Sequence, residues 1–314
     1  MLLIWSCRGD KTADWFIERY LISAKLDWVR FDTDMFPEAY RVYGDMEGVT
    51  LLTQDGRRLF ESRDVSSVWY RRELPSTFDT LSLSPHALEY SRSEAQTTLI
   101  AIRKALSHAR WLNNPEENRI ASDKLSQLRD AKSRGFRIPE TLITNDALAA
   151  VELAKKYGGR VIAKALRRGT VEDGRVFYSS LVDIAMLQRH LMSIAVAPVI
   201  FQEPIKKEFE IRAIVIGNAC FGVKIFSQEH DITSVDWRRS PLSLKHEIID
   251  LPTDVAEHCI AMTRSCRLLY SAFDLIVTPE GEYVFLEHNP AGQFAWLEEL
   301  TGIPIGKKLL EVLS

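Results

Sequence analysis

The chain has 314 residues, of which 46 % are hydrophobic and 26 % are charged, and its formal net charge at pH 7 is −3. This length suits one large domain or two to three smaller lobes, and the near-neutral charge predicts no general attraction to nucleic acid or to an anionic membrane. The four cysteines form no C-x-x-C pair, so we expect no zinc site and a reducing, cytoplasmic setting.

The first third of the chain alternates strand and helix patterns. Strands are predicted in "LLIW", "DWVRFD" and "VSSVWYRREL", and helices in "TADWFIERYLISA" and from about 85 to about 109. The segment "GVTLLTQDGRRLFES" is typical of a hairpin that turns at Asp55-Gly56. These elements predict a small α/β lobe over 1–112, which ends at the break formed by Asn113, Asn114 and Pro115.

The rest of the chain predicts helices between strand pairs. Two antiparallel strands around a loop are expected in "RVIAKALRRGTVEDGRVFYSS", and an apolar strand in "VIFQEPI". Two hairpins are expected in "FEIRAIVIGNACFGVKIFSQ" and "SAFDLIVTPEGEYVFLEHN". Helices are predicted at 147–157, 183–195 and 253–269.

Charged residues recur inside these predicted strands, where charge is normally excluded. Alternation, with one strand face in water, explains any single one of them. Asp274 and Glu287, however, lie on the two arms of one hairpin with apolar neighbours, and two carboxylates brought together repel unless a cation lies between them. Asn289 shares the face of Glu287 because side chains alternate with period two. This set of oxygen ligands favours Mg²⁺ or Mn²⁺ over zinc.

A magnesium ion held by few protein oxygens usually bridges phosphates. The candidate basic partners of those phosphates are Lys124, Lys164, Arg212 and Arg238, and the loop Arg168-Gly169-Thr170 could cover a triphosphate. The G-x-x-x-x-G-K-[ST], G-x-G-x-x-G and G-x-S-x-G motifs are absent from the sequence. The chain therefore lacks the common nucleotide fingerprints and the serine-nucleophile motif.

Taken together, these stretches resemble an ATP-grasp ligase. The resemblance rests on "ASDKLSQL", "RVIAKAL", "FQEPI", "FEIR", "VDWR", "FDLIV" and "FLEHNPAGQFAWLEELTGIPI". More narrowly, the chain is similar to the microviridin-type graspetide synthetases, which are ATP-grasp ribosomal peptide maturases. This closer similarity rests on "TADWFIERY", "VRFDTDMFPEAY", "SVWYRRELP", the segment from "WLNNPEENRIASD" to "PETLITN", and "NPAGQFAWLEELTG", and it covers most of the chain.

The resemblance implies an α/β fold with α+β lobes. It implies a pre-ATP-grasp α/β lobe at 1–112 and an ATP-grasp domain at 113–314, divided into a small central lid lobe at about 141–200 and a C-terminal antiparallel-sheet lobe at about 201–314. It also implies ATP and Mg²⁺, with Mn²⁺ as a substitute. The implied partner is a precursor peptide with a leader and an acidic core, and the implied assembly is a homodimer with no nucleic-acid or membrane partner.

The resemblance also implies a role for each matching site residue. Lys124 and Lys164 would contact the nucleotide phosphates, and Arg212 and Arg238 would stabilise charge on the transferring phosphoryl group. The hinge that reads adenine through backbone groups would be Gln202, Glu203, Pro204 and Ile205, with Glu203 near the amino group. Glu210 would contact the ribose. The magnesium ligands would be Asp274, Glu287 and Asn289. His288 stands where the family has an aliphatic residue, and we expect it to face away from the metal and to have a structural or substrate-side role.

The implied reaction joins two side chains of a precursor peptide. An Asp or Glu carboxylate becomes an acyl phosphate at the expense of ATP, and a Ser or Thr hydroxyl or a Lys amine then displaces phosphate to close an ester or amide macrocycle. Two alternatives stay open: a carboxylate–amine ligase for a small molecule or a protein C-terminus, similar to glutamate ligases, and a non-catalytic nucleotide- or peptide-binding module. Arg71-Arg72 is either a contact to the acidic core or an exposed strand-end pair.

Overall fold

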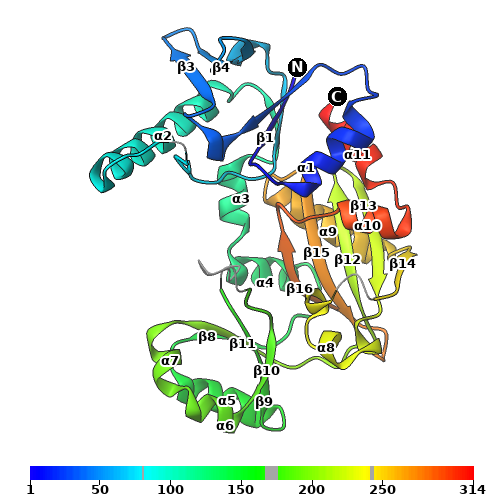
Figure 1. The fold of residues 1–314 in the computed structure, drawn as a ribbon. Coiled ribbons are helices and arrows are strands. Elements are labelled where there is room, and N and C mark those ends of the chain that lie inside the picture. Colours follow the sequence, from blue (N-terminus) through cyan, green and yellow to red (C-terminus); the bar gives the residue numbers. More distant parts are fainter. Residues whose placement is uncertain (80, 167–175, 241–243) are drawn as a thin grey trace.

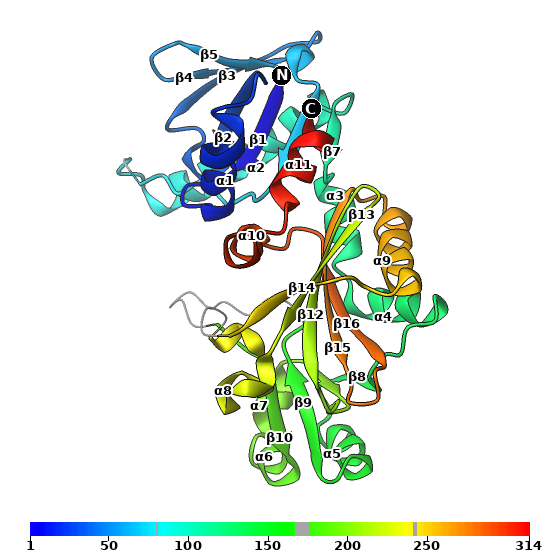
Figure 2. The same cartoon turned by 90° about the vertical axis from the view of Figure 1, so that its right-hand side faces the viewer.

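The computed structural model describes residues 1–79, 81–166, 176–240 and 244–314. It confirms the mixed α/β class. One parallel sheet and three antiparallel sheets are distributed along the molecule, from the N-terminal lobe to a small lobe at the opposite end (Figures 1 and 2). No helix within the described ranges has the length and apolar character needed to cross a membrane.

The N-terminal lobe is built on a parallel sheet in the order β2-β1-β6-β7. Its strands are β1 (Leu2–Ser6), β2 (Trp28–Asp32), β6 (Ser67–Tyr70) and β7 (Arg110–Leu112). The antiparallel strands β3 (Tyr40–Gly44), β4 (Val49–Thr53) and β5 (Arg58–Glu61) form a second sheet, and the predicted turn at Gly56 is confirmed with φ +86°.

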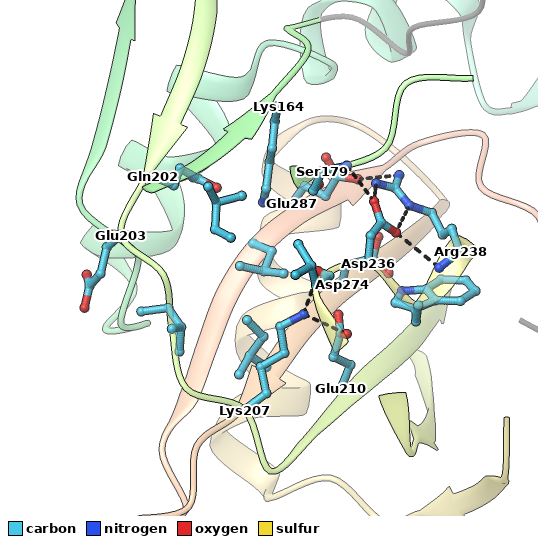
Figure 3. Close-up of a pocket in the computed structure, with 16 residues that line it drawn as sticks. Lys164, Ser179, Gln202, Glu203, Lys207, Glu210, Asp236, Arg238, Asp274 and Glu287 are labelled. Carbon is cyan, nitrogen blue, oxygen red and sulfur yellow. Dashed lines mark hydrogen bonds and ion pairs between the residues drawn. The ribbon is translucent and has the colours of Figure 1, made fainter. Parts of the chain in front are cut away.

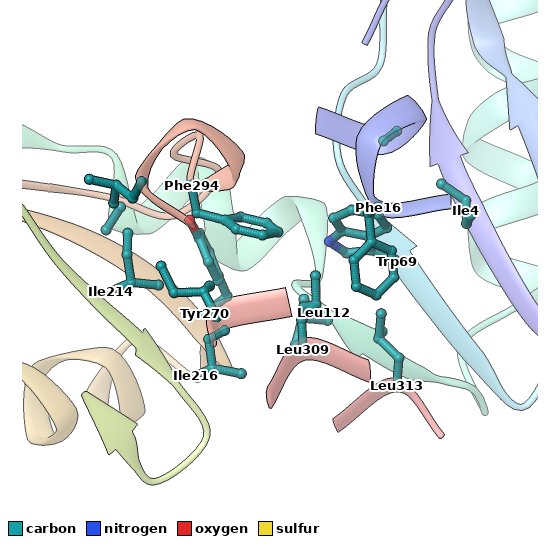
Figure 4. Packing of buried hydrophobic residues seen from close by; sticks show 14 of the residues in the cluster. Ile4, Phe16, Trp69, Leu112, Ile214, Ile216, Tyr270, Phe294, Leu309 and Leu313 are labelled. Carbon is teal, nitrogen blue, oxygen red and sulfur yellow. The ribbon is translucent and has the colours of Figure 1, made fainter. Parts of the chain in front are cut away.

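Alternation along β1 supplies two cores. Leu3 and Trp5 pack against α2 (Pro85–Ala105), whereas Leu2 and Ile4 pack against α1 (Lys11–Phe16). The second core also contains residues of the C-terminal helix α11 (Ile305–Leu313), as Figure 4 shows for Leu309 and Leu313 beside Phe16 and Trp69. The end of the chain thus returns to the N-terminal lobe. The predicted boundary between the pre-ATP-grasp lobe and the ATP-grasp domain at 112/113 stays a prediction.

Two helices, α3 (Pro115–Ala121) and α4 (Lys124–Ser133), lead to a four-stranded antiparallel sheet in the order β10-β9-β11-β8. This sheet consists of β8 (Thr141–Thr144), β9 (Arg160–Lys164), β10 (Ser180–Asp183) and β11 (Val199–Gln202). The helices α5 (Ala147–Lys156), α6 (Ile184–Arg189) and α7 (Leu191–Val196) bury their apolar side chains against it. We call this sheet with its helices the small lobe.

The five-stranded antiparallel sheet has the order β14-β13-β12-β15-β16 and contains both hairpins predicted from the sequence. Its strands are β12 (Phe209–Ile216), β13 (Ala219–Ile225), β14 (His246–Ile249), β15 (Tyr270–Val277) and β16 (Tyr283–Asn289). Ile211 and Ala213 face α4 and α9 (Thr253–Ser265). Because side chains alternate along a strand, Glu210 and Arg212 face the opposite side, toward the small lobe. Two further helices, α8 (Asp231–Ser234) and α10 (Ala295–Thr301), complete this part of the chain.

Several predicted boundaries were wrong by a few residues. The helix expected at 253–269 ends at Ser265, because Arg267 adopts the left-handed conformation with φ +56°. The helix expected at 183–195 is two short helices that meet at His190, whose ψ of 22° departs from helical geometry. The strand in "VIFQEPI" ends at Gln202, so Glu203, Pro204 and Ile205 form a connection between the lobes.

Candidate active site

Two adjoining cavities lie between the small lobe and the polar face of the five-stranded sheet. The larger has a volume of about 520 Å³ and the smaller, drawn in Figure 3, about 70 Å³. They share Lys164, Gln202, Arg238, Asp274 and Glu287. Of the twelve site residues predicted from the sequence, only Pro204 lines neither cavity. The fold therefore gathers residues spread over more than 160 positions of the chain.

The two predicted metal-binding carboxylates are direct partners across the β15–β16 hairpin. Asp274 pairs with Glu287, and the strands carry an irregularity immediately after this pair, between Asp274 and Leu275. Arg212 Nη1 donates to Asp274 Oδ1 at 2.8 Å, while its buried Nε has no partner among the described atoms. Asn289 lines the larger cavity together with both carboxylates. The three oxygen-bearing side chains thus face one space, as alternation predicted.

Three cations surround Glu287. Lys124 Nζ donates to Oε2 at 2.6 Å, and Arg238 Nη1 lies 4.0 Å from Oε1. Burial alone would raise the pKa of Glu287, but Lys124, Arg238 and Lys164 outweigh it and hold that pKa far below its usual range. Burial lowers the pKa of Lys164 to about 8, although Glu287 opposes the shift. The site therefore presents positive charge balanced by a carboxylate that stays ionised.

Arg238 is held in place by a residue to which sequence reasoning assigned no role. Asp236 Oδ1 and Oδ2 accept from its Nε and Nη2 at 2.8 and 2.7 Å. Asp236 Oδ2 also accepts from the backbone N–H of Ser179 at 2.9 Å, which ties Arg238 to the chain that enters β10 (Figure 3). Asp236 stands inside the "VDWR" motif, so its proximity to Arg238 was visible, but its contact with Ser179 was not.

The lining of the smaller cavity combines polar residues with the apolar side chains Ile162, Ile205, Ile276 and Leu286. Gln202 Nε2 donates to Thr141 Oγ1 at 2.9 Å, and its buried Oε1 has no partner among the described atoms. Glu210 accepts from Lys207 Nζ at 2.9 Å, a partner that the sequence analysis missed. An apolar lining beside hydrogen-bonding groups suits a heteroaromatic ring.

The side chain of Glu203 points away from the cavity, so any contact of this residue with adenine is left to its backbone, as the resemblance implied. Its carboxylate lies 3.1 Å from Arg137 Nη2 and accepts from the backbone N–H of Glu140 at 3.1 Å. Figure 3 shows this side chain pointing away from the cavity. Only its backbone is left to face a ligand in the smaller cavity.

His288 faces the other side of the sheet, as alternation predicted. It is 1 % exposed, its Nδ1 lies 2.8 Å from Ser271 Oγ, and its ring stacks on Phe273 with centroids 5.2 Å apart. Burial lowers the pKa of His288 to about 4, so the ring is neutral at pH 7. This residue packs the core behind the site.

The donor set fits a magnesium ion that is also held by a ligand. The described residues contain no group of three or more His, Cys, Asp or Glu that could hold a metal alone. Two carboxylates and one amide suit Mg²⁺, which usually keeps several waters and binds substrate phosphates. The loop Arg168-Gly169-Thr170, expected to cover a triphosphate, lies outside the described residues.

Arg71 is one place where an interpretation of the sequence was wrong. It is 3 % exposed, which excludes an exposed strand-end position for this residue. Its neighbour Arg72 is half-buried.

Comparisons with known proteins find the same overall fold and a matching family. Residues 1–119 match the family described as the MvdD pre-ATP grasp domain. A Chryseobacterium gregarium RiPP-associated ATP-grasp ligase, solved in complex with ADP and a leader and core peptide, has a TM-score of 0.90 and 29 % identity over 99 % of this chain and 96 % of its own. The comparison with curated proteins finds no match.

Two macrocyclases from Microcystis aeruginosa MRC are also similar. MdnB has a TM-score of 0.80 and 31 % identity, and MdnC, solved with the precursor peptide MdnA, has 0.85 and 28 %. Each match covers 99 % of this chain and 98 % of the other.

Proposed function

The chain belongs to the family of RiPP-associated ATP-grasp ligases and macrocyclases, and from that premise we propose that it is an ADP-forming peptide macrocyclase. Its substrate is a ribosomal precursor peptide with a leader and an acidic core. The observation that carries the proposal is the cluster of Lys124, Lys164, Arg212 and Arg238 around the Asp274–Glu287 pair. Such a cluster binds phosphate and metal and contains no nucleophile of its own.

The chemistry follows from this arrangement. A substrate carboxylate attacks the γ-phosphate of ATP to give an acyl phosphate and ADP, and a Ser or Thr hydroxyl or a Lys amine then displaces phosphate. The protein has little covalent work to do in the first step, because phosphoryl transfer depends on positioning and on neutralising charge. The substrate carboxylate and the ATP phosphates are both negative, so the carboxylate could not approach the phosphates unless cations balanced their combined charge.

We assign the nucleotide contacts as follows. The smaller cavity takes the adenine ring, with Gln202 and the backbone of Glu203, Pro204 and Ile205 at its edge. Glu210 lies where a ribose hydroxyl would follow, and Lys124 and Lys164 contact phosphates. Arg212 and Arg238 are directed at the transferring phosphoryl group, and the free Nε of Arg212 supports this role.

We assign Asp274, Glu287 and Asn289 as the residues that hold Mg²⁺, or Mn²⁺ in its place. The ion supplies charge neutralisation at the phosphates. Asp236 keeps Arg238 in its orientation through two side-chain hydrogen bonds.

The proposal is tested by mass spectrometry on acidic peptides encoded beside the gene. A peptide incubated with enzyme, ATP and magnesium should lose the mass of one water molecule for each ring and release one ADP for each bond. Lys-containing and Ser- or Thr-containing variants of the peptide separate amide from ester closure. No mass change with any of these peptides contradicts the proposal.

The same assay discriminates the two alternatives. A ligase for a small molecule or a protein C-terminus would release ADP with free amino acids as acceptors, and the product would gain mass. A non-catalytic module would release no ADP with any acceptor. The similarity over 99 % of the chain to MdnB, a macrocyclase, favours ring closure.

We further propose that the enzyme is a homodimer, as its family resemblance implies. Light scattering coupled to gel filtration should then give twice the mass of the 35.9-kDa chain. A value of one chain mass at micromolar concentration contradicts the dimer and leaves the proposed reaction intact.

A further inference from the structure

We propose that Lys207 sets the sugar specificity of the nucleotide site by holding Glu210 in one orientation, as the acceptor of a ribose hydroxyl group. The inference rests on the proposed function, in which Glu210 lies beside the ribose. Both residues line the smaller cavity, and Lys207 stands between the connection that joins the lobes and the first residue of β12. Lys207 is thus a positioning residue, because it acts on the nucleotide through Glu210.

Two hydrogen bonds hold the ammonium group of Lys207. Its Nζ donates to Glu210 Oε1 at 2.9 Å and to the Val235 carbonyl, 28 positions further along the chain, at 2.9 Å. Figure 3 shows the side chains of Lys207 and Glu210 pointing toward one another. The two side chains are 11 % and 5 % exposed, so solvent screens this ion pair far less than a pair on the surface. A hydrogen bond on each side fixes where the ammonium group lies.

The carboxylate of Glu210 depends on this partner. Glu210 is buried, and burial raises the pKa of its carboxyl group, with a smaller effect of Asp274 in the same direction. The charge and the hydrogen bond of Lys207 oppose that rise, and the Ser227 hydroxyl opposes it more weakly. Removal of Lys207 would leave a buried carboxylate without its counter-ion, which favours the protonated form. Because an ionised carboxylate is the stronger acceptor, Lys207 controls how well Glu210 binds a hydroxyl group.

Acceptor capacity remains on Glu210 for a ligand. An ionised carboxylate offers about four lone-pair positions on its two oxygens. Lys207 Nζ uses one of them at Oε1, and Ser227 acts on the same carboxylate. Glu210 lines the cavity that we assign to adenine, at the side where the ribose follows. A ribose hydroxyl group therefore has an acceptor whose position and charge are already fixed.

The charge of Lys207 lies beside the sugar rather than the phosphates. Lys164 lines both cavities and Lys124 lines the larger one, whereas Lys207 lines only the smaller of the two. Two N–H groups of Lys207 already donate inside the protein. Replacing Lys207 should therefore change the recognition of the ribose more than the recognition of the phosphates.

Nucleotide binding to the whole chain tests the inference. Calorimetric titration with magnesium present compares ADP with 2′-deoxy-ADP and 3′-deoxy-ADP, so that the two analogues identify which hydroxyl group Glu210 accepts. We expect the wild-type enzyme to bind one analogue about 10- to 100-fold more weakly than ADP, the range for a hydrogen bond to a charged group. In Lys207→Met this ratio should fall to about 2- to 10-fold, the range for a hydrogen bond between neutral groups.

Further variants separate the ribose contact from general stability. Lys206→Met removes the same charge from the exposed neighbouring position and should keep the wild-type ratio. Lys207→Arg keeps a positively charged donor and should retain most of that ratio. Glu210→Gln should lower the ratio as Lys207→Met does, and adding Lys207→Met to it should lower the ratio no further. Should Lys207→Met not fold, as judged by its melting temperature and circular dichroism, Lys207→Gln takes its place in the comparison.

The outcomes are distinct. Equal weakening of ADP and both analogues by Lys207→Met would show that Lys207 has only a structural role, and would overturn the inference while the proposed function stands. Equal binding of ADP and both analogues by the wild-type enzyme would overturn the inference without any variant. Failure of the wild-type enzyme to bind ADP would overturn the inference and the proposed nucleotide site together.

Discussion

Replacing Glu287 by Gln removes the negative charge from the centre of three cations. Lys124 Nζ lies 2.6 Å and Arg238 Nη1 4.0 Å from its carboxylate oxygens. The Lys124–Glu287 pair is about a quarter exposed, at 27 % and 26 %, so solvent screens it and we expect a loss of only about 1–2 kcal/mol in the free energy of unfolding. For a chain of this size each kcal/mol lowers the melting temperature by about 2–4 °C.

The effect on turnover should be much larger than the effect on stability. An amide cannot neutralise a divalent cation, and metal-assisted charge stabilisation is worth several kcal/mol. Because each 1.4 kcal/mol is about tenfold in rate, we expect Glu287→Gln to lower peptide-dependent ADP release by at least about 100-fold.

The assay is ADP release across a magnesium titration, at a temperature well below the melting temperature of both proteins. Glu280→Gln is the matched control, because Glu280 is exposed at the turn of the same hairpin and loses the same charge. Turnover and magnesium dependence of Glu287→Gln equal to those of wild type would refute the metal assignment.

Three further predictions concern residues around the site. Burial lowers the pKa of Lys164 to about 8, and its ammonium attracts phosphate only below that pH, so kcat/KM for ATP should fall as pH rises through about 8. Lys164→Gln should abolish this fall in kcat/KM, and a fall that persists in the variant would exclude Lys164 as its source. The pKa of His288 is lowered from 6.5 to about 4, so the unfolded chain takes up a proton between these values while the folded chain does not. Stability should therefore fall by up to about 3 kcal/mol as pH drops through this window, and urea unfolding of His288→Gln should lack that slope. A Cβ on Gly292 would lie 2.5 Å from Ala272 Cβ and 2.6 Å from Arg212 Nη2, so Gly292→Ala should displace Arg212 and lower turnover, whereas Gly44→Ala, with no atom nearer than 3.7 Å, should match wild type.

The face that carries the proposed metal ligands was predictable because it depends on local rules. Asp274, Glu287 and Asn289 stand on two strands joined by a short turn, so the hairpin and the period-two alternation together determine which side chains share a face. The same alternation correctly turned His288 away from the site. The resemblance to ATP-grasp ligases then supplied candidate partners on the facing lobe, and eleven of the twelve predicted residues line one or both of the two cavities.

Other features were not predictable because they join residues far apart in the chain. The contact of Asp236 with Ser179 spans 57 positions, and the packing of Leu313 beneath β1 spans almost the whole chain. The carboxylate of Glu203 turns toward Arg137, 66 positions earlier, and no pattern in "FQEPI" indicates that direction.

The amino-acid sequence by itself determined most of the strands and helices, the two hairpins and the identity of the charged face, because these follow from periodicity and turn chemistry over short distances. It did not indicate the short elements β3, β7, β14 and α3. Only the tertiary structure decided that Arg71 is buried as an ion-pair partner of Asp10, beside Pro290 and Ala291, which follow β16. That position results from packing between the N-terminal lobe and the five-stranded sheet, and such long-range contacts leave no mark in the local pattern of either segment.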